Sequence, residues 1–286
     1  MEPRVRNLAE GAGRIEWLDR IGNPVADALK KVLKPGAARD LLSGTWLGHP
    51  LHPVLTDVPL GAWVSSFFLD LFGGKRARDA SDTLLRLAGV SAIPTAIAGL
   101  SDWVDTVEED RRVGVVHAAG NTLALGFLVL SLRARKRGRR GRGVLLSALG
   151  QGVATVSAYL GGHLSFGKAV GVDQTAFEEG PTEWTAVMDA AALSDEKPAV
   201  AGLGGGLDVL LYRMNGRVHA ISNRCNHRAC PLSDGDFEGT TVTCPCHGSM
   251  FRLTDGGVLR GPATGPQPSY DTREQDGKIE VKLRNG

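Results

Sequence analysis

Long apolar runs alternate with short charged connections through the first two thirds of the chain. About 20 residues of helix cross a bilayer, and four runs are long enough: residues 54–73, 86–106, 114–132 and 144–163. Glycine and other small residues recur within these runs, as membrane helices tolerate. The pattern predicts an all-α four-helix transmembrane bundle. Four residues interrupt the apolar runs and keep a buried soluble bundle open as the alternative: Asp57, Pro59, Asp70 and Pro94.

A different pattern begins near residue 181. Short segments alternate between apolar and polar residues, which is typical of strands with one buried face, and Asn215-Gly216 and Asp276-Gly277 suit two-residue hairpin turns. The clearest strands are LDVLLYRM, RVHAIS and KIEVKL. His219 lies on the second of these and is interpreted as an ordinary strand residue. We therefore predict a multidomain chain in which the bundle is followed by a small all-β domain.

The region before the first long run has one amphipathic stretch. Asn23-Pro24 is a good helix start and Pro35-Gly36 a good stop, and apolar residues between them share one stripe. Such a helix lies at a membrane surface or packs as a cap on the bundle. The predicted organisation is an N-terminal amphipathic segment at 1–40, a four-helix membrane domain at 41–172 and the β domain at 182–284.

Charge bears on partners and on orientation. The formal net charge of +2 gives no general case for nucleic acid as a partner. The first and third connections between the apolar runs are basic and the second begins with three acidic residues, Glu108 to Asp110. The positive-inside rule then places both termini outside the cytoplasm, although the first 53 residues carry eight Lys and Arg. Arg139-Arg140 is a candidate internal twin-arginine export signal or a chance pair in a basic run.

All four cysteines fall in two short loops of the β domain. The first loop reads Cys225-Asn-His227-Arg-Ala-Cys230 and the second reads Cys244-Pro-Cys246-His247. Two Cys and two His at such spacings could hold zinc. One Cys and one His from each loop, with a further cysteine left in each, favour iron and sulfur instead.

Residues 182–284 resemble a Rieske domain, with CNHRACPLSDG and CPCHGS as its two cluster loops. In that family one iron of a [2Fe-2S] cluster is held by two thiolates and the other by two imidazoles, which gives potentials of roughly −150 to +300 mV. The resemblance implies four ligands: Cys225, His227, Cys244 and His247. It also implies a disulfide between Cys230 and Cys246, and such bonds persist in oxidising compartments. A free cysteine pair in a cytoplasmic domain is the alternative.

The same resemblance assigns roles to residues near the loops. Ser249 matches a family serine whose hydroxyl reaches a bridging sulfide, and Gly261 to Thr264 correspond to a loop that covers the cluster. Phe251 stands where the quinol-oxidising members have tyrosine. Since hydrogen bonds to the sulfurs favour the reduced cluster, we expect a potential below that of those members.

In the membrane half, residues 44–63 resemble the signature of an uncharacterised family of four-helix membrane domains. The resemblance covers about residues 40–170, and it implies an architecture but no activity.

Histidines cluster at one predicted membrane face, with Asp57, Asp102 and Asp105 at a similar depth. Ionisable residues in membrane segments are costly and often functional. The clustered histidines are His49, His52, His117 and His163. Two of them could hold a haem b or a metal between helices. The alternative is that they are solvated or helix-capping residues.

Together these features predict a membrane-anchored Rieske protein that carries one electron at a time, as a component of an oxidoreductase system rather than a stand-alone enzyme. Its expected partners are a redox protein, a quinone or a haem, together with the lipid bilayer. A redox-sensing or small-molecule-binding module is the alternative. A Rieske oxygenase is disfavoured because it needs a second iron held by two His and a carboxylate, and no His follows His247.

Overall fold

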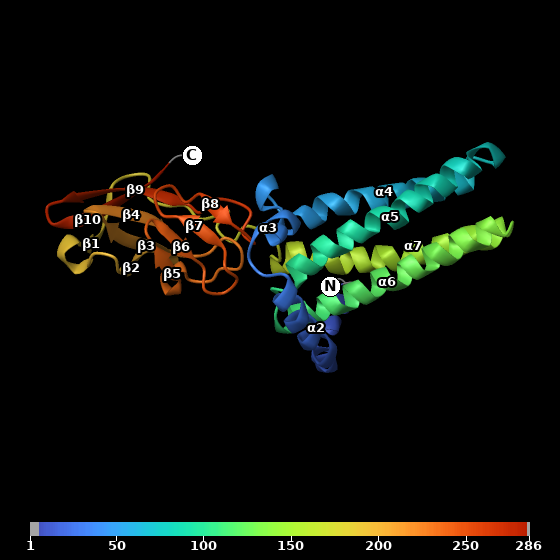
Figure 1. Cartoon of the computed structure of the whole chain (residues 1–286), viewed down its shortest axis with the longest axis horizontal. Helices are drawn as coiled ribbons and strands as arrows, with labels where there is room; N and C mark the ends of the chain where they lie inside the picture. Colours follow the sequence, from blue (N-terminus) through green and yellow to red (C-terminus); the bar gives the residue numbers. More distant parts are fainter. Residues whose placement is uncertain (1–5, 285–286) are drawn as a thin grey trace. The chain divides into compact units, whose positions relative to one another are not determined.

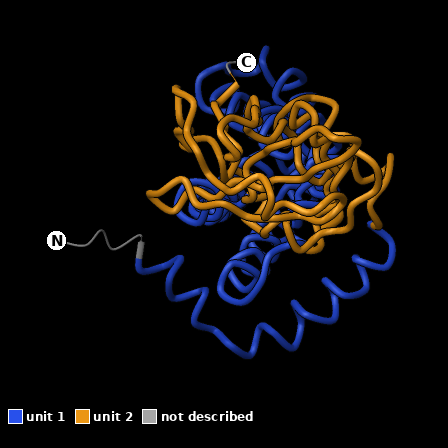
Figure 2. The backbone as a smooth tube through the Cα atoms, turned by 90° about the vertical axis from the view of Figure 1, so that its left-hand side faces the viewer, with its two compact units in different colours: residues 1–33, 51–170 blue, residues 34–50, 171–286 orange. Residues whose placement is uncertain are grey.

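The computed structural model describes residues 6–284 (Figure 1). The chain forms two compact units, which Figure 2 shows in separate colours. Of the described residues, the first unit contains 6–33 and 51–170, and the second contains 34–50 and 171–284. The second unit thus includes residues 34–50, which the predicted boundaries divide between the N-terminal segment at 1–40 and the membrane domain at 41–172.

Four long helices build the first unit: α4 (Leu51–Phe72), α5 (Arg78–Trp103), α6 (Glu108–Lys136) and α7 (Arg140–Gly162). Each overlaps one predicted run, and each is long and apolar enough to cross a membrane. The four-helix prediction is confirmed. A short π-helical turn, His163–Gly167, follows α7, and a 3-10 turn, Lys75–Ala77, precedes α5.

Inside the bundle, small and polar side chains lie beside a hydrophobic cluster around Leu85 and Leu128, whereas its outer surface carries many large apolar side chains. Buried positions include Ser66, Ser81 and Ser131, whereas Phe72 and Val90 are mostly exposed. A soluble bundle would bury its large apolar side chains. Small residues between helices and large apolar residues around them are typical of a bundle whose outer surface contacts lipid.

The helices before residue 34 differ from the expected amphipathic helix. They are α1 (Arg6–Gly13), a 3-10 turn (Glu16–Leu18) and α2 (Asp19–Val32), which begins before the predicted start and carries Pro24 inside it. The Asp19 carboxylate accepts two hydrogen bonds from the Arg112 guanidinium of α6, at 2.9 and 2.6 Å. This bidentate ion pair fixes the first turn of α2, so a tertiary contact sets the helix start.

The two hairpins α4–α5 and α6–α7 repeat one set of contacts. Ser66 Oγ of α4 donates to Ser81 O of α5, and Ser131 Oγ of α6 donates to Gly143 O of α7. Three pairs of residues from α4 and α6 share one spacing along the chain: His52 and His117, Ser66 and Ser131, and Asp70 and Arg135. The bundle is therefore a structural duplication of one helical hairpin.

The second unit contains two antiparallel sheets. The larger has the order β1-β10-β9-β4-β3-β2 and consists of β1 (Thr185–Asp189), β2 (Pro198–Gly204), β3 (Leu207–Met214), β4 (Arg217–Ser222), β9 (Ser269–Gln275) and β10 (Lys278–Leu283). The smaller consists of β5 (Asp236–Glu238), β6 (Thr241–Thr243), β7 (Met250–Arg252) and β8 (Val258–Arg260). Short 3-10 turns lie at Ala190–Ala192 and Leu232–Asp234. The predicted all-β domain is confirmed.

Asn215-Gly216 forms the predicted tight hairpin between β3 and β4, and both residues have positive φ, as a type I′ turn requires. Alternate residues of β3 and β10 enter a core between the larger sheet and its covering segments, with Val209, Leu211 and Ile279 fully buried. A second core lies beneath the two cysteine loops and contains Phe251, Leu253, Cys225 and Cys244. The loops therefore rest on a rigid base.

Candidate metal centre

The two cysteine loops have the same backbone design. In the loop after β4, Ala229 N donates to Cys225 O at 2.8 Å and Cys225 N donates to Cys230 O at 2.9 Å. In the loop after β6, Gly248 N donates to Cys244 O at 3.0 Å and Cys244 N donates to Ser249 O at 2.8 Å. Each loop thus closes on its first cysteine and presents that side chain inward.

Both loops turn through a residue with positive φ, Ala229 at 59° and Gly248 at 80°. Glycine adopts this conformation without strain, whereas alanine places its Cβ close to the following carbonyl. The first loop accordingly carries a conformational cost that the second avoids.

The four predicted ligands meet between the loops. Cys225 and Cys244 are 1% and 2% exposed, and their thiols are hydrogen-bonded to each other. The rings of His227 and His247 lie edge to face with centroids 5.0 Å apart. The two thiols form one donor pair and the two imidazoles form another, and each loop contributes one member of each pair. An asymmetric two-iron centre requires this arrangement.

Burial governs the charge of these donors. The pKa of Cys225 is raised, first by its hydrogen bond to Cys244 and then by burial. Burial also holds the pKa of His227 well below its usual value, and the neighbouring His247 adds to this effect. The lowered pKa of His227 favours its neutral form, which is the form of imidazole that binds metal, while thiols release protons when they bind metal.

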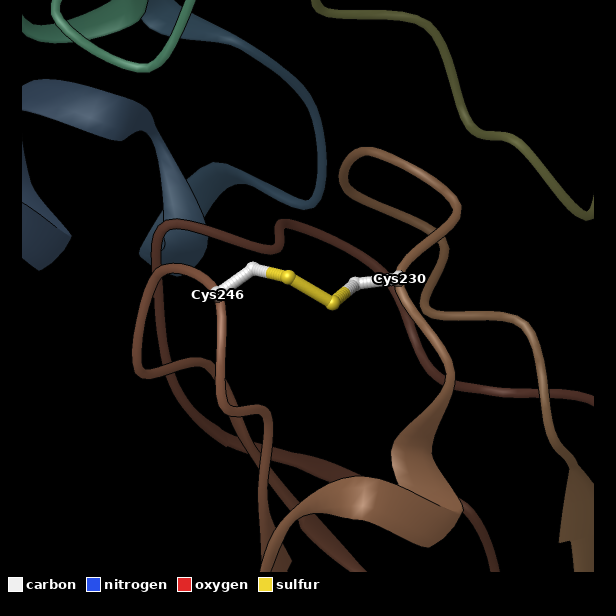
Figure 3. The surroundings of a disulfide bond; sticks show 2 residues. All are labelled: Cys230 and Cys246. Carbon is white, nitrogen blue, oxygen red and sulfur yellow. A yellow bond between two sulfur atoms is a disulfide. The ribbon is translucent and has the colours of Figure 1, made fainter.

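A disulfide joins the loops. Cys230 and Cys246 are bonded, with their Cα atoms 6.4 Å apart (Figure 3). The predicted bridge is present in the structure. It closes the two loops over one side of the thiol pair and fixes their separation.

A third loop is tied to both cysteine loops by buried polar groups. Ser249 Oγ accepts a hydrogen bond from Ala263 N at 3.0 Å, so its own proton remains to be donated. Asn226, between Cys225 and His227, donates from Nδ2 to Gly265 O at 2.7 Å and to Pro266 O at 3.1 Å. The sequence analysis did not single out Asn226, although its position between Cys225 and His227 in the first motif could have indicated a role in the loop.

Residues 34–50 pack against the same loops. This segment contains α3 (Ala37–Ser43) and a 3-10 turn (Thr45–Leu47). Asp40 Oδ1 accepts from Gly261 N at 2.8 Å, and Thr45 Oγ1 donates to Ala263 O at 3.0 Å. A Cβ added to Gly248 would lie 2.7 Å from Pro35. No local signal in the sequence connects this segment to loops more than 180 residues away.

The membrane-domain histidines separate into different environments. His49 is exposed and belongs to the second unit, whereas His52 and His117 lie half-buried within the bundle. His163 starts the π-helical turn, and its Nε2 is buried with no hydrogen-bond partner among the described residues. His219 lies on β4 opposite Tyr212 of β3, as a strand residue.

Comparison with known families matches residues 183–271 to the Rieske [2Fe-2S] domain. The ferredoxin component of the naphthalene 1,2-dioxygenase/salicylate 5-hydroxylase systems of Ralstonia sp is 32% identical over 98 residues, which is 34% of this chain and 94% of that protein. The chain belongs to the Rieske [2Fe-2S] family. The Rieske domain also matches the 3-phenylpropionate/cinnamic acid dioxygenase ferredoxin subunit of Escherichia coli (strain K12), at 36% identity over 76 residues, 26% of this chain and 72% of that protein.

Among solved structures, the Sphingomonas yanoikuyae B1 ferredoxin matches with 25% identity and a TM-score of 0.33, covering 35% of this chain and 98% of that one. Residues 48–174 match a second family, described as "Predicted membrane protein (DUF2231)". This match and the four apolar helices support membrane localisation.

The donor set fits the [2Fe-2S] cluster that the family implies. Two buried thiols in mutual contact and two adjacent imidazoles, one of each from each loop, supply four monodentate ligands at a single place. Zinc needs four donors around one ion, whereas the ring nitrogens of His227 and His247 do not group with the thiol of Cys225 or Cys244 within 4.8 Å among the described residues. The arrangement supports iron and sulfur over zinc.

Proposed function

We propose that this chain is a membrane-anchored one-electron carrier whose Rieske domain holds a [2Fe-2S] cluster. Cys225 and Cys244 hold one iron and His227 and His247 hold the other. When bound, the cluster accepts and releases one electron at a potential in the range of roughly −150 to +300 mV. The observation that carries the proposal is the convergence of these four side chains from two loops of the same backbone design.

The surrounding residues set how readily an electron is accepted. Ser249 holds its hydroxyl in one orientation by accepting the Ala263 N–H, which leaves its proton to be donated to a cluster sulfur. Phe251 is fully buried and offers no such donor. Because hydrogen bonds to the sulfurs favour the reduced form, this domain should have a lower potential than relatives with a hydroxyl at that position.

The membrane bundle keeps the carrier at a bilayer. Its first and third connections are basic, so the positive-inside rule places them in the cytoplasm and the Rieske domain outside it. The Cys230–Cys246 disulfide supports the same side, since structural disulfides persist in oxidising compartments. A cysteine-accessibility assay on the Arg139 connection and on the Rieske surface tests this orientation.

The partner is proposed to be a redox protein or a quinone. The related ferredoxin components belong to dioxygenase systems, which supports electron transfer to or from another protein. A sensing module remains the second candidate. Rapid reduction by a quinol or a reductase, followed by oxidation by a second protein, favours the carrier, whereas a cluster that exchanges electrons slowly with both favours the sensor.

Electron paramagnetic resonance of the reduced, detergent-purified protein tests the cluster assignment. We expect the rhombic Rieske signal in the wild type, its loss or conversion in His247→Ala, and its retention in the matched control His219→Ala, which alters a histidine of the same domain away from the loops. An unchanged signal in His247→Ala, with membrane insertion intact, would refute the ligand set.

A further inference from the structure

Segment 34–50 is attached at two points to the covering loop, Gly261 to Thr264. The Gly261 N–H donates to Asp40 Oδ1 at 2.8 Å, and Thr45 Oγ1 donates to Ala263 O at 3.0 Å. The partners are 221 and 218 residues apart along the chain. The two attachments lie on either side of Pro262, so the segment holds the covering loop from both ends of that residue.

The backbone of Gly261 leaves room for this contact. A Cβ added to Gly261 would overlap Thr45 Oγ1 and would lie 3.2 Å from Asp40 Oδ1. Any larger residue at this position would therefore push the segment away from the covering loop. The glycine thus permits the two polar side chains of the segment to reach the backbone of the loop.

Ala263 continues the contact toward the thiol pair. It is 2% exposed and lies in the same buried cluster as Cys225 and Cys244. Its carbonyl accepts from Thr45, and its N–H donates to Ser249 Oγ at 3.0 Å. Ser249 is fully buried, and its backbone oxygen accepts from Cys244 N at 2.8 Å. A series of hydrogen bonds therefore leads from Thr45 through Ala263 and Ser249 to Cys244.

The position of the Ala263 N–H determines how the Ser249 hydroxyl is oriented. A hydroxyl rotates to suit its partners, and here the Ala263 N–H occupies one acceptor site of the Ser249 oxygen. The hydroxyl proton is therefore directed to another acceptor, and a hydroxyl that accepts one hydrogen bond becomes a stronger donor. Displacement of Ala263 would weaken the hydrogen bond that Ser249 can donate.

We propose that Asp40 and Thr45 are positioning residues for the [2Fe-2S] cluster, and that they hold the covering loop so that Ser249 donates to a cluster sulfur. This inference rests on the proposed carrier function and deepens it, because it adds a segment from before the membrane helices to the residues that set the potential. Since hydrogen bonds to the sulfurs favour the reduced form, segment 34–50 raises the reduction potential.

Reduction potentials of the full chain in detergent, followed by the Rieske signal, test the proposal. Thr45→Val removes the hydroxyl with little change in volume and should lower the potential, by less than Ser249→Ala does. A hydrogen bond of ordinary net strength changes an equilibrium constant by roughly two- to tenfold, and a tenfold change is about 59 mV for one electron. Thr45→Ser keeps the hydroxyl and should restore the wild-type potential.

Two further variants separate positioning from other effects. Thr272→Val is the matched control, because Thr272 Oγ1 of β9 donates to Val218 O at 2.7 Å within the larger sheet, and it should leave the potential unchanged. Gly261→Ala keeps every polar group and only separates the segment from the loop, so it should lower the potential as Thr45→Val does. Asp40 is less suited to this test, because loss of its negative charge would by itself favour the reduced cluster.

A double-variant cycle shows whether Thr45 acts through Ser249. Thr45→Val should shift the potential in the wild-type background and should have no effect in Ser249→Ala, where the hydroxyl that it orients is absent. Equal shifts in both backgrounds, no shift in either, or an equal shift in Thr272→Val would overturn the proposal.

Amide exchange of Ala263 in the full chain as purified gives a readout that does not depend on the potential. Thr45→Val should speed this exchange and Thr272→Val should not. Unchanged protection of Ala263 in Thr45→Val would overturn the proposal, even if that variant held no cluster. Absence of the Rieske signal from the wild type would instead refute the carrier function.

Discussion

The cysteine loops and the helical hairpins both form a paired site from a repeated piece of backbone, and they differ in how each pair is held together. In the Rieske domain the two loops share one hydrogen-bond pattern and are joined by a covalent bond, Cys230–Cys246. In the bundle the two hairpins are joined by an ion pair, in which Asp70 contacts Arg135. Residues at equivalent positions of two repeats face each other. The two regions differ in how these facing residues interact.

The difference follows from the chemistry of the facing residues. Two thiols can face each other because a metal cluster can bind both of them. Two identical charges buried at one axis would repel strongly in a medium of low dielectric, and at this axis one repeat has Asp70 where the other has Arg135. Asp82 and Arg140 complete the network, with Arg135 at 2.7 Å from Asp82 and Arg140 at 2.6 Å from Asp70.

The largest effect should come from breaking the ion pair of the bundle. Asp70→Asn leaves Arg135 buried with Asp82 as its remaining described carboxylate partner, and removal of one member of a buried pair costs about 3–5 kcal/mol. Unfolding of the bundle in mixed micelles with increasing SDS measures this. Asp79→Asn, at an exposed position of α5, is the control, and equal stability of the two variants would show that the network contributes nothing.

Removal of the disulfide tests the covalent link between the two cysteine loops. Cys230→Ser/Cys246→Ser opens a link across 16 residues, for which chain entropy predicts a loss of about 3 kcal/mol. We expect the cluster absorbance to disappear at a lower guanidinium concentration than in the wild type. A reductant should produce the same shift in wild-type protein and none in the variant; a wild type that resists denaturation equally well when reduced would contradict this.

Exchange of the turn residues tests how alike the two loops are. Gly248→Ala adds a Cβ at a φ of 80° and 2.7 Å from Pro35, and should destabilise the Rieske domain by about 1–2 kcal/mol. Ala229→Gly removes the matching strain from the first loop and should be neutral or slightly stabilising. Thermal unfolding of both variants measures the difference. Equal destabilisation by both would mean that the loops are not conformationally equivalent.

The smallest effect should come from weakening the contact between α2 and α6. This contact involves the second hairpin alone, so it is not part of the repeat. The Arg112 guanidinium lowers the pKa of Asp19 below 3.8. A depressed carboxyl pKa stabilises the folded contact above pH 3.8, and this contribution is lost as the pH falls through the lowered value. Amide exchange of Asp19–Val32, corrected for intrinsic rates, should rise in that window. Asp19→Asn should show the higher exchange already at neutral pH and little further change on acidification.

The sequence alone determined the elements and the ligand types. Apolar runs of membrane length gave the four helices, because helix length must match bilayer thickness. Alternation and Asn215-Gly216 gave the central hairpin of the β domain, and the two Cys–His motifs gave the four candidate ligands, because local spacing restricts which donors can share a loop. The start of α2 was misplaced because a contact with Arg112 sets it.

The tertiary structure alone decided how distant segments combine. The packing of Asp40 and Thr45 against the loop at Gly261 and the equivalence of the two hairpins both depend on contacts between residues far apart in the chain. Hydrophobic periodicity reports which face of an element is apolar, but it does not report which other element covers that face. For this reason the sequence identifies the candidate Cys and His donors, whereas the tertiary structure determines which of them lie together.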